Sequence, residues 1–386
     1  MENKNHILIL MNGWSGKSIS GGDQHVLDLC EIIKKKNSVC LMLPKLGRDY
    51  VESESRAQVE GVRFIDLPDL AGSESINSSV LLVINYFLRS VMACFKSFSC
   101  SEAAVVISAS HFLYDVLPAV VYKFCHRAKI TVYVYHVVGE QKRKETLRNL
   151  TAVFFENLSL FLIKKFFDLV VTDNQITHKE LLDLGVLSKR IVLSNLCVRR
   201  PDPSWLTAPK AYDLVYMGRI SRLKGSYDLI EVVKNLQSDK GAVVLTMIGG
   251  GDEVESVKSA VESCGLSQNF KFMGFLTGGV KYKALSQGRI FVFPSYEEGW
   301  GIALAEAMSL GLPCVTYDLP AVRSVFGEGP IYSPVGDSKN MASQVMRLLA
   351  DPLYYGGRAK QSLKAVENYY LDSSKFKEFE VLGIKI

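Results

Sequence analysis

Short apolar runs alternate along the chain with longer segments whose apolar residues recur at helical spacing. Such runs, bounded by polar and glycine-containing turns, predict buried strands, and the longer segments predict the helices that cover them. The strands expected in the first half are residues 7–11, 39–43, 62–65, 104–108, 130–135 and 169–172. Regular alternation of strand and helix is typical of parallel sheets with helices on both faces, so we expect an α/β fold of the doubly wound class.

The alternation stops in a polar, proline-containing stretch, RRPDPSWLTAPKAYD, and then restarts. The strands expected after it are residues 214–217, 243–248, 271–273, 290–293 and 314–317. Because 386 residues exceed one ordinary domain, the pattern predicts two domains in tandem. Their expected bounds are 1–200 and 212–365, with a linker at 201–211 and a C-terminal helix at 366–386 that can pack back on the first domain.

Two segments, residues 80–95 and 154–167, are unusually apolar. Neither contains the roughly 18–20 clean apolar residues that a membrane-spanning helix needs. We expect them to be buried or half-buried helices, and the alternative is that they rest on a membrane surface. The observation that supports this alternative is the group of basic residues near the second segment, which are Lys142, Arg143, Lys144, Arg148, Lys164 and Lys165.

The net charge and the cysteine content indicate which ligands and which cellular compartment to expect. The net charge of +5 is modest and suits an anionic substrate or an anionic membrane surface. The eight cysteines form no CxxC pair and no metal-ligand spacing with histidine, which is typical of reduced thiols in a cytoplasmic protein. The apolar stretch at the N-terminus is too short for a secretory signal and predicts a first strand.

The loop after the first strand contains Gly16-Lys17-Ser18, the last three residues of a nucleotide-binding P-loop. That motif requires a glycine five residues before Gly16, where this chain has Met11, so an NTPase is not expected. Gly21 and Gly22 then open a helical pattern, with Asp23 next to them. Backbone N–H groups at such a helix start can approach an anion closely, although an ordinary strand-to-helix turn would have the same sequence.

The most informative segment is FPSYEEGWGIALAEAMSLGLPCV, at 293–315. A strand is expected to end at Phe293, a loop to carry Glu298, and a helix to begin near Ile302 and stop at Gly311. The helical rise places Glu298 and Glu306 about 10–12 Å apart, which is too far for two carboxylates acting on one glycosidic bond. The spacing fits two ends of an extended ligand, with hydroxyls at each end and an anionic diphosphate at the helix N-terminus between them.

This segment resembles the E-x7-E motif of the retaining glycosyltransferases of family 4, which have the GT-B architecture. Further blocks resemble the same family: LVYMGRISRLKGSYDLIEVV, with Gly218, Arg219 and Lys224; LTMIGGGDE; FKFMGFLT, with Gly274 and Phe275; and ISGGDQHVLDL. The resemblance covers most of the chain and is most specific from residue 214 to 337. It implies two Rossmann-like domains that face each other across a cleft, the first binding the acceptor and the second the nucleotide-sugar donor.

The resemblance also implies residue roles. Glu298 would bind hydroxyls of the donor sugar and Glu306 the ribose, while Arg219 and Lys224 would hold the diphosphate and stabilise charge on the leaving group, without a metal. His136, at the end of a strand, resembles a histidine that many members place near the donor sugar. The donor-binding set that the resemblance implies is Gly21, Gly22, Gly218, Arg219, Lys224, Gly274, Phe275, Glu298, Gly299, Trp300, Gly301, Ile302, Ala303 and Glu306. Where the family commonly has Asn-Gly, this chain has Asn195-Leu196-Cys197, close to the hinge.

We therefore expect a retaining glycosyltransferase of the hexosyltransferase type, which moves a sugar from a nucleotide diphosphate sugar to a hydroxyl of a glycan or lipid-linked acceptor. The expected setting is cell-surface polysaccharide assembly in the cytoplasm, with peripheral contact to the inner face of the membrane. No cofactor, metal or nucleic-acid partner is expected. Two alternatives stay open: a GT-B sugar-nucleotide epimerase, and a non-catalytic protein that binds nucleotide sugars or glycans.

Overall fold

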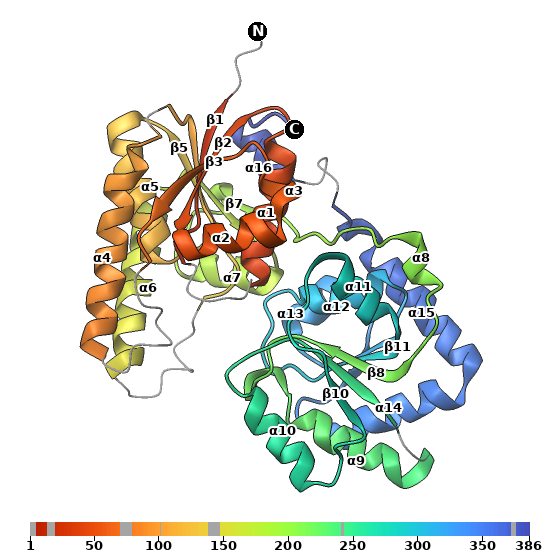
Figure 1. Cartoon of the computed structure of the whole chain (residues 1–386). Coiled ribbons are helices and arrows are strands. Elements are labelled where there is room, and N and C mark those ends of the chain that lie inside the picture. The colour runs from red at the N-terminus through yellow and green to blue at the C-terminus, as the bar shows by residue number, and fades with distance from the viewer. Residues whose placement is uncertain are drawn as a thin grey trace. The chain divides into compact units, whose positions relative to one another are not determined.

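The computed structural model describes residues 5–13, 20–69, 79–100, 102–137, 147–240, 243–371 and 376–386. The chain divides into two compact units, one formed by Met1–Asn195 with Asp372–Ile386 and one by Leu196–Leu371. Each unit contains a parallel sheet covered by helices (Figure 1). The unit boundary at Asn195 lies five residues before the expected one. Residues 366–386 do not form the one C-terminal helix that was expected. Val366 is the last residue of a long helix in the second unit, and a short helix at Lys377–Leu382 lies in the first unit.

The first unit has a seven-stranded parallel sheet in the order β3-β2-β1-β4-β5-β6-β7. Its strands are β1 (His6–Leu10), β2 (Ser38–Pro44), β3 (Arg63–Leu67), β4 (Val105–Ser108), β5 (Lys129–Val134), β6 (Leu169–Thr172) and β7 (Ile191–Leu193). Its helices are α1 (Gly21–Ile33), α2 (Lys45–Glu54), α3 (Arg56–Val59), α4 (Ser79–Ser97), α5 (Leu113–His126), α6 (Leu147–Phe166), α7 (Gln175–Asp183), the 3-10 turn η3 (Ser188–Arg190) and α16 (Lys377–Leu382).

The core of the first unit lies between the sheet and helices α4, α5 and α6. Leu10, Val132, Tyr122 and Phe167 are buried there, contributed by the sheet, by α5 and by the residue that follows α6. Helix α5 packs against both α4 and α6, so these three helices form one layer (Figure 1). The two unusually apolar sequence segments fall in α4 and α6. Among the helices that the structure describes, none combines the length and hydropathy that crossing a bilayer requires.

The end of the chain is part of the first unit. Glu378 of α16 is fully buried and accepts a hydrogen bond of 2.9 Å from the hydroxyl of Tyr133. The amides of Asn5 and Asn37 donate to the backbone carbonyls of Gly383 and Lys385, at 3.1 and 2.6 Å. These contacts tie residues that are far apart in the sequence, and they fix the last eleven described residues to the N-terminal sheet.

The second unit has a six-stranded parallel sheet in the order β10-β9-β8-β11-β12-β13. Its strands are β8 (Tyr212–Met217), β9 (Leu245–Ile248), β10 (Phe270–Phe272), β11 (Gly288–Phe293), β12 (Cys314–Tyr317) and β13 (Ile331–Ser333). Its helices are α8 (Pro203–Leu206), η4 (Arg222–Lys224), α9 (Asp228–Lys240), α10 (Val254–Ser263), α11 (Gly278–Ser286), α12 (Ile302–Ser309), α13 (Pro320–Phe326), α14 (Ser338–Ala350), α15 (Pro352–Val366) and η5 (Glu367–Tyr369). The predicted doubly wound α/β class is therefore confirmed in both units.

Candidate functional site

The strand order of the second unit identifies where a ligand is expected to bind. From β8 the chain proceeds outward through β9 to β10, and then returns to the other side of β8 with β11. In open α/β sheets, ligands bind at the carboxyl ends of the strands where the order reverses. The loops that follow β8 and β11 meet at this point, and they carry Lys224 and Glu298.

Lys224 joins these two loops directly. Its ammonium group donates a hydrogen bond of 2.6 Å to Oε1 of Glu298 and another of 2.7 Å to the backbone carbonyl of Glu297. The two side chains of the ion pair are 29% and 13% exposed, so the pair is partly accessible to solvent and does not lie in the core. The sequence assigned both residues to the donor site, and the structure brings them into contact.

Gly225 allows the two loops to approach each other. Its φ of +69° lies in the left-handed region, and a Cβ atom at this position would be 1.9 Å from the backbone oxygen of Pro294. The backbone of Tyr296 also donates to the carbonyl of Leu223, at 3.0 Å. A residue with a side chain at position 225 would therefore force apart the loops that hold Lys224 and Glu298.

Helix α12 begins immediately after this loop. Gly301 is its N-cap, with a φ of +95°, and no side chain caps the helix start. The first backbone N–H groups of an α-helix have no partner within the helix, so those of Ile302 and Ala303 are available to an external acceptor. The helix dipole favours an anion at the same place.

The indole of Trp300 is buried. It is 2% exposed and lies edge-to-face against the rings of Phe326 and Tyr369, with centroids 5.0 and 5.3 Å away. The predicted donor contact at this position can therefore come from the peptide group and not from the ring. The buried indole anchors the loop that precedes Gly301.

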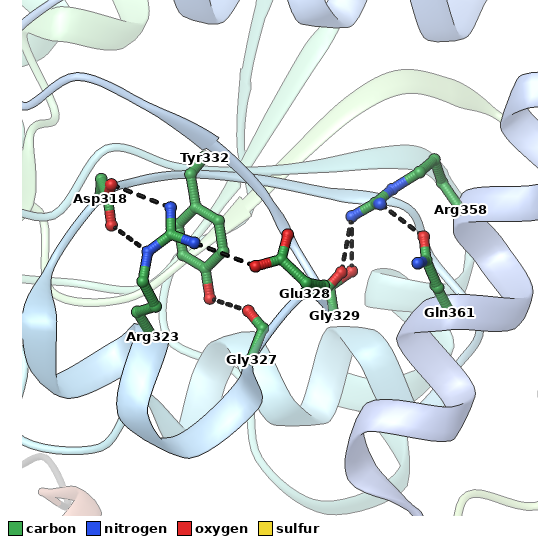
Figure 2. Close-up of polar contacts among 8 residues, drawn as sticks. All are labelled: Asp318, Arg323, Gly327, Glu328, Gly329, Tyr332, Arg358 and Gln361. Carbon is green, nitrogen blue, oxygen red and sulfur yellow. Dashed lines mark hydrogen bonds and ion pairs between the residues drawn. The ribbon is translucent and has the colours of Figure 1, made fainter.

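A polar network surrounds residues 327–329, the turn that follows Phe326, as Figure 2 shows. Arg323 makes a two-pronged ion pair with Asp318, at 2.8 and 2.9 Å. Arg358 of α15 donates to the backbone carbonyl of Gly329, at 2.9 Å. The turn between α13 and β13 is fixed from both sides, and this stabilises the aromatic support beneath the start of α12.

Glu306 lies near the other end of α12 and is 6% exposed. Its Oε1 accepts hydrogen bonds from the ammonium of Lys281 at 2.6 Å and from the hydroxyl of Tyr282 at 2.9 Å. Both partners come from α11, and sequence reasoning missed them because no local pattern relates residues that are about 25 positions apart. Their contacts fix the Glu306 side chain and balance its charge.

The two carboxylates are arranged in the same way. Glu298 and Glu306 each use Oε1 to bind a lysine, and neither Oε2 makes a hydrogen bond within the described part of the chain. A carboxylate oxygen in that state can accept a bond from a ligand hydroxyl. The site thus offers two acceptors, one before α12 and one within it, with the helix N-terminus between them.

The remaining predicted residues of the second unit lie after strands β8 and β10 of the same sheet. Arg219 is exposed, and its backbone carbonyl accepts a hydrogen bond of 2.7 Å from the hydroxyl of Tyr216. Gly218 follows β8, Gly274 follows β10, and Phe275 is 43% exposed. None of these positions is contradicted by the structure, and their contacts with a donor stay predictions.

In the first unit, Gly21 and Gly22 begin helix α1 as expected, but the helix start is already capped. Ser20 and Asp23 form a capping box in which the Ser20 Oγ accepts from the Asp23 backbone at 3.2 Å and the Asp23 carboxylate accepts from the Ser20 backbone at 3.0 Å. Asp23 therefore has a structural role, and its negative charge lies where an anion would bind. A Cβ atom at Gly22 would lie 2.9 Å from the ring of Tyr135, so close packing against this ring also explains a glycine at this position.

His136 follows β5 and is exposed. Its ring lies edge-to-face on His111, with centroids 5.7 Å apart. His111 is buried and its Nε2 lies 3.2 Å from Oε1 of Glu156, which is also buried. The sequence pointed to His136 but missed the two buried residues beside it, since Glu156 is 45 residues away from His111.

A second buried polar group occupies the point where strand order reverses in the first unit, between β1 and β4. The carboxylate of Asp115 accepts from the Asn12 backbone at 2.8 Å and from the Ser110 hydroxyl at 2.5 Å. Arg89 donates to the Asn12 carbonyl at 3.2 Å. Burial raises the pKa of Asp115 to about 7, against the lowering effect of these hydrogen bonds. This cluster is buried, and sequence reasoning did not predict it.

Some predicted features lie outside the described residues. These are Gly16-Lys17-Ser18 and the basic residues Lys142, Arg143 and Lys144. Arg148 lies in α6, but the structure does not describe its side chain.

Comparison with known proteins agrees with this geometry. Residues 201–368 match the family of glycosyl transferases group 1. Over 160 residues the chain is 29% identical to a phosphatidyl-myo-inositol mannosyltransferase of Mycobacterium leprae, covering 40% of this chain and 42% of the relative. It is 25% identical over 140 residues to a 2-deoxystreptamine N-acetyl-D-glucosaminyltransferase of Niallia circulans, covering 36% of each. The alignments thus span less than half the length of these curated relatives.

The fold is shared along nearly the whole chain. HepE of Anabaena, solved in complex with UDP and glucose, superposes with a TM-score of 0.76 at 14% identity, covering 98% of this chain and 99% of HepE. The predicted GT-B fold is therefore confirmed. The match of residues 201–368 to the glycosyl transferases group 1, which lies within the second unit, agrees with the sequence resemblance. Membership of family 4 stays a prediction.

Proposed function

We propose that the chain is a retaining glycosyltransferase that uses a nucleotide diphosphate sugar as donor. The observation that carries the proposal is the pair Glu298 and Glu306, each held by a lysine through one oxygen, at either side of an uncapped helix start. A nucleotide diphosphate sugar has hydroxyls at both ends and two negative phosphates between them. Its chemistry matches the order of acceptors and donors at this site.

Each group would have a separate role in binding. Oε2 of Glu298 would accept from hydroxyls of the sugar, and Oε2 of Glu306 from hydroxyls of the ribose. The backbone N–H groups of Ile302 and Ala303 would bind the diphosphate. Arg219 and Lys224 would supply positive charge beside it, the first through a planar fork and the second as a point charge.

The same cations would accelerate the reaction. As the bond between the sugar and the diphosphate breaks, negative charge grows on the leaving oxygen, and groups that stabilise this charge lower the barrier. We infer that side-chain cations replace a metal ion in this role. The acceptor hydroxyl would attack from the face that the diphosphate leaves, and the departing diphosphate would take the hydroxyl proton, so that the sugar keeps its configuration. His136 would lie near the donor sugar.

The first unit would bind the acceptor, which we propose to be a glycan or a lipid-linked glycan in cell-surface polysaccharide assembly. Support comes from the relatives, which include the M. leprae phosphatidyl-myo-inositol mannosyltransferase and a poly(glycerol-phosphate) alpha-glucosyltransferase of Bacillus subtilis. Those names describe lipid and polymer acceptors. A cytoplasmic protein with peripheral contact to the inner face of the membrane would meet such acceptors.

The test is a screen of thermal shift against UDP-, GDP- and ADP-sugars, followed by an assay for free nucleoside diphosphate with the donors that stabilise the protein. Transfer or slow hydrolysis releases nucleoside diphosphate. An epimerase would instead yield a new sugar nucleotide, and a binding protein would leave the donor unchanged. Stabilisation by none of these donors would overturn the proposal.

A further inference from the structure

Helix α4 carries a stripe of apolar side chains on its exposed side. Its exposed side chains include Leu81, Ile84, Leu88 and Phe95, and Phe95 is 73% exposed. At 100° per residue these four positions lie within one narrow stripe along the helix. Soluble proteins rarely expose large contiguous apolar surface without a binding role, so this stripe requires an explanation.

Helix α6 presents a second stripe. Phe154, Leu158 and Phe161 are exposed at spacings of four and three residues, and Phe154 is 63% exposed. The two helices are neighbours, because the rings of Tyr86 from α4 and Phe155 from α6 have centroids 4.7 Å apart (Figure 1). We call the exposed apolar side chains of these two helices the α4/α6 face.

The charges beside the α4/α6 face have one sign. In the described parts of α4, α5 and α6 the only acidic side chains are Asp115 and Glu156, and both are buried. The exposed charges include Lys96 of α4 and Lys165 of α6, and Lys165 lies over the ring of Phe161, with 5.7 Å from its nitrogen to the centroid. Exposed acidic groups lie beyond the ends of these helices: Asp168 after α6 is paired with Lys123, and Glu102 after α4 lies 3.6 Å from His6 Nε2.

We propose that the α4/α6 face docks on an anionic lipid bilayer, with its aromatic and aliphatic side chains in the headgroup boundary and its lysines on the lipid phosphates. Exposed phenylalanines beside lysines, with no exposed carboxylate, are the composition that interfacial helices need. A symmetric dimer through the same face would bring the lysines of both copies into one interface, and these helices have no exposed carboxylate in their described parts to pair with them. The inference deepens the membrane contact proposed above and assigns it to named helices.

The first test concerns the apolar part. Phe95→Ser, Phe154→Ser and Phe161→Ser are combined in one variant. The matched control combines Leu353→Ser and Val381→Ser, which replace exposed apolar residues on α15 and α16. Sedimentation is measured with vesicles of phosphatidylglycerol and phosphatidylcholine, and with vesicles of phosphatidylcholine alone. We expect the parent and the control to pellet with the anionic vesicles, and the triple variant to lose most of this binding.

The second test concerns charge. Lys96→Glu with Lys165→Glu should weaken partitioning at least about twentyfold, since each basic residue near an anionic surface contributes a factor of about five. Lys339→Glu with Lys360→Glu, on α14 and α15, makes the same change in net charge elsewhere and should have a much smaller effect. Binding of the parent should also fall as salt rises.

Several results would overturn the inference: no pelleting of the parent with anionic vesicles at low salt, equal binding to neutral vesicles, or equal loss in variant and control. Light scattering that shows a dimer dissociated by the triple variant would assign the α4/α6 face to a second copy instead. Donor hydrolysis is measured in parallel without vesicles. If the triple variant still hydrolyses the donor, its loss of vesicle binding is not caused by loss of the folded active site. If the parent hydrolyses no donor, the proposed function is wrong whether or not the protein binds vesicles.

Discussion

Replacing Glu306 and Lys281 separately distinguishes a ligand-binding carboxylate from a structural one. Both Glu306→Ala and Lys281→Met break the same 2.6 Å ion pair, whose side chains are 8% and 20% exposed. A pair with this partial burial is worth more than an exposed pair and less than a fully buried one. Each variant should therefore lower the free energy of unfolding by about 1–3 kcal/mol.

The two variants should differ in ligand binding. Glu306→Ala also removes Oε2, the oxygen proposed to accept from ribose hydroxyls, and a lost hydrogen bond to a charged group costs about 1.5–3 kcal/mol. The Kd for free nucleoside diphosphate should rise roughly 10–150-fold. Lys281→Met leaves the carboxylate in place with the Tyr282 hydroxyl at 2.9 Å, so its Kd should stay within about fivefold of the parent.

Isothermal titration calorimetry with the nucleoside diphosphate that the parent binds measures both constants, and denaturant unfolding measures stability. If Glu306→Ala bound as tightly as the parent, the ribose role would be wrong. If Lys281→Met weakened binding as much as Glu306→Ala, the carboxylate would act only through its ion pair. Either result would refute the reasoning.

Three further predictions concern the two units. Gly225→Ala should destabilise the protein by several kcal/mol and abolish turnover, because its Cβ would meet a carbonyl oxygen at 1.9 Å; Gly265→Ala, with a φ of +70° and no atom within 4 Å, should cost only about 1–2 kcal/mol. Arg219→Ala and Lys224→Ala should each lower turnover at least about tenfold, while EDTA leaves the parent active. Asp115→Asn should flatten the pH dependence of the free energy of unfolding. The pKa of Asp115 in the folded protein, about 7, exceeds the ordinary value near 3.9. The protonated Asp115 carboxyl therefore contributes its full stabilisation below about pH 4, and this contribution is lost as pH rises through about 7.

Each of these has a direct check. Denaturant unfolding compares the two glycine variants, and equal destabilisation would mean that the close approach to Pro294 is not rigid. Steady-state rates test the cations, and full inactivation by EDTA that magnesium or manganese restores would overturn the metal-free proposal. Unfolding between about pH 4 and pH 8 tests Asp115, with the exposed Asp49→Asn as control. An unchanged slope in Asp115→Asn would assign the pH dependence to other groups.

The alternation of apolar runs was sufficient to predict the two doubly wound units and most of their strands. It missed β7 and β13, which are edge strands of only three residues and are therefore too short to form a long apolar run. It also predicted one helix for 366–386. The structure divides this segment between α15, η5 and α16, because Glu378 and its neighbours gain burial by packing on the first sheet.

The candidate site was predictable to the extent that its residues lie in one local motif. Glu298, Gly301 and Glu306 share one loop and helix, so spacing alone placed them together. Lys281 and the His111–Glu156 pair depend on contacts between distant segments, which no periodicity encodes. The sequence also placed Trp300 in the donor-binding set without indicating which part of the residue would contact the donor. The need to bury a large aromatic side chain directs its indole into the core.

The central claim is that Glu298 acts on the sugar of a nucleotide diphosphate sugar. The most direct measurement is nucleoside diphosphate release from a donor that stabilises the protein, compared among the parent, Glu298→Ala and the neighbouring control Glu297→Ala. We predict that the parent and Glu297→Ala release nucleoside diphosphate, while Glu298→Ala still binds the donor but turns it over about 10–150-fold more slowly, as expected for one lost charged hydrogen bond in the transition state. Turnover by Glu298→Ala equal to the parent, or no release by the parent at saturating donor, would contradict the account.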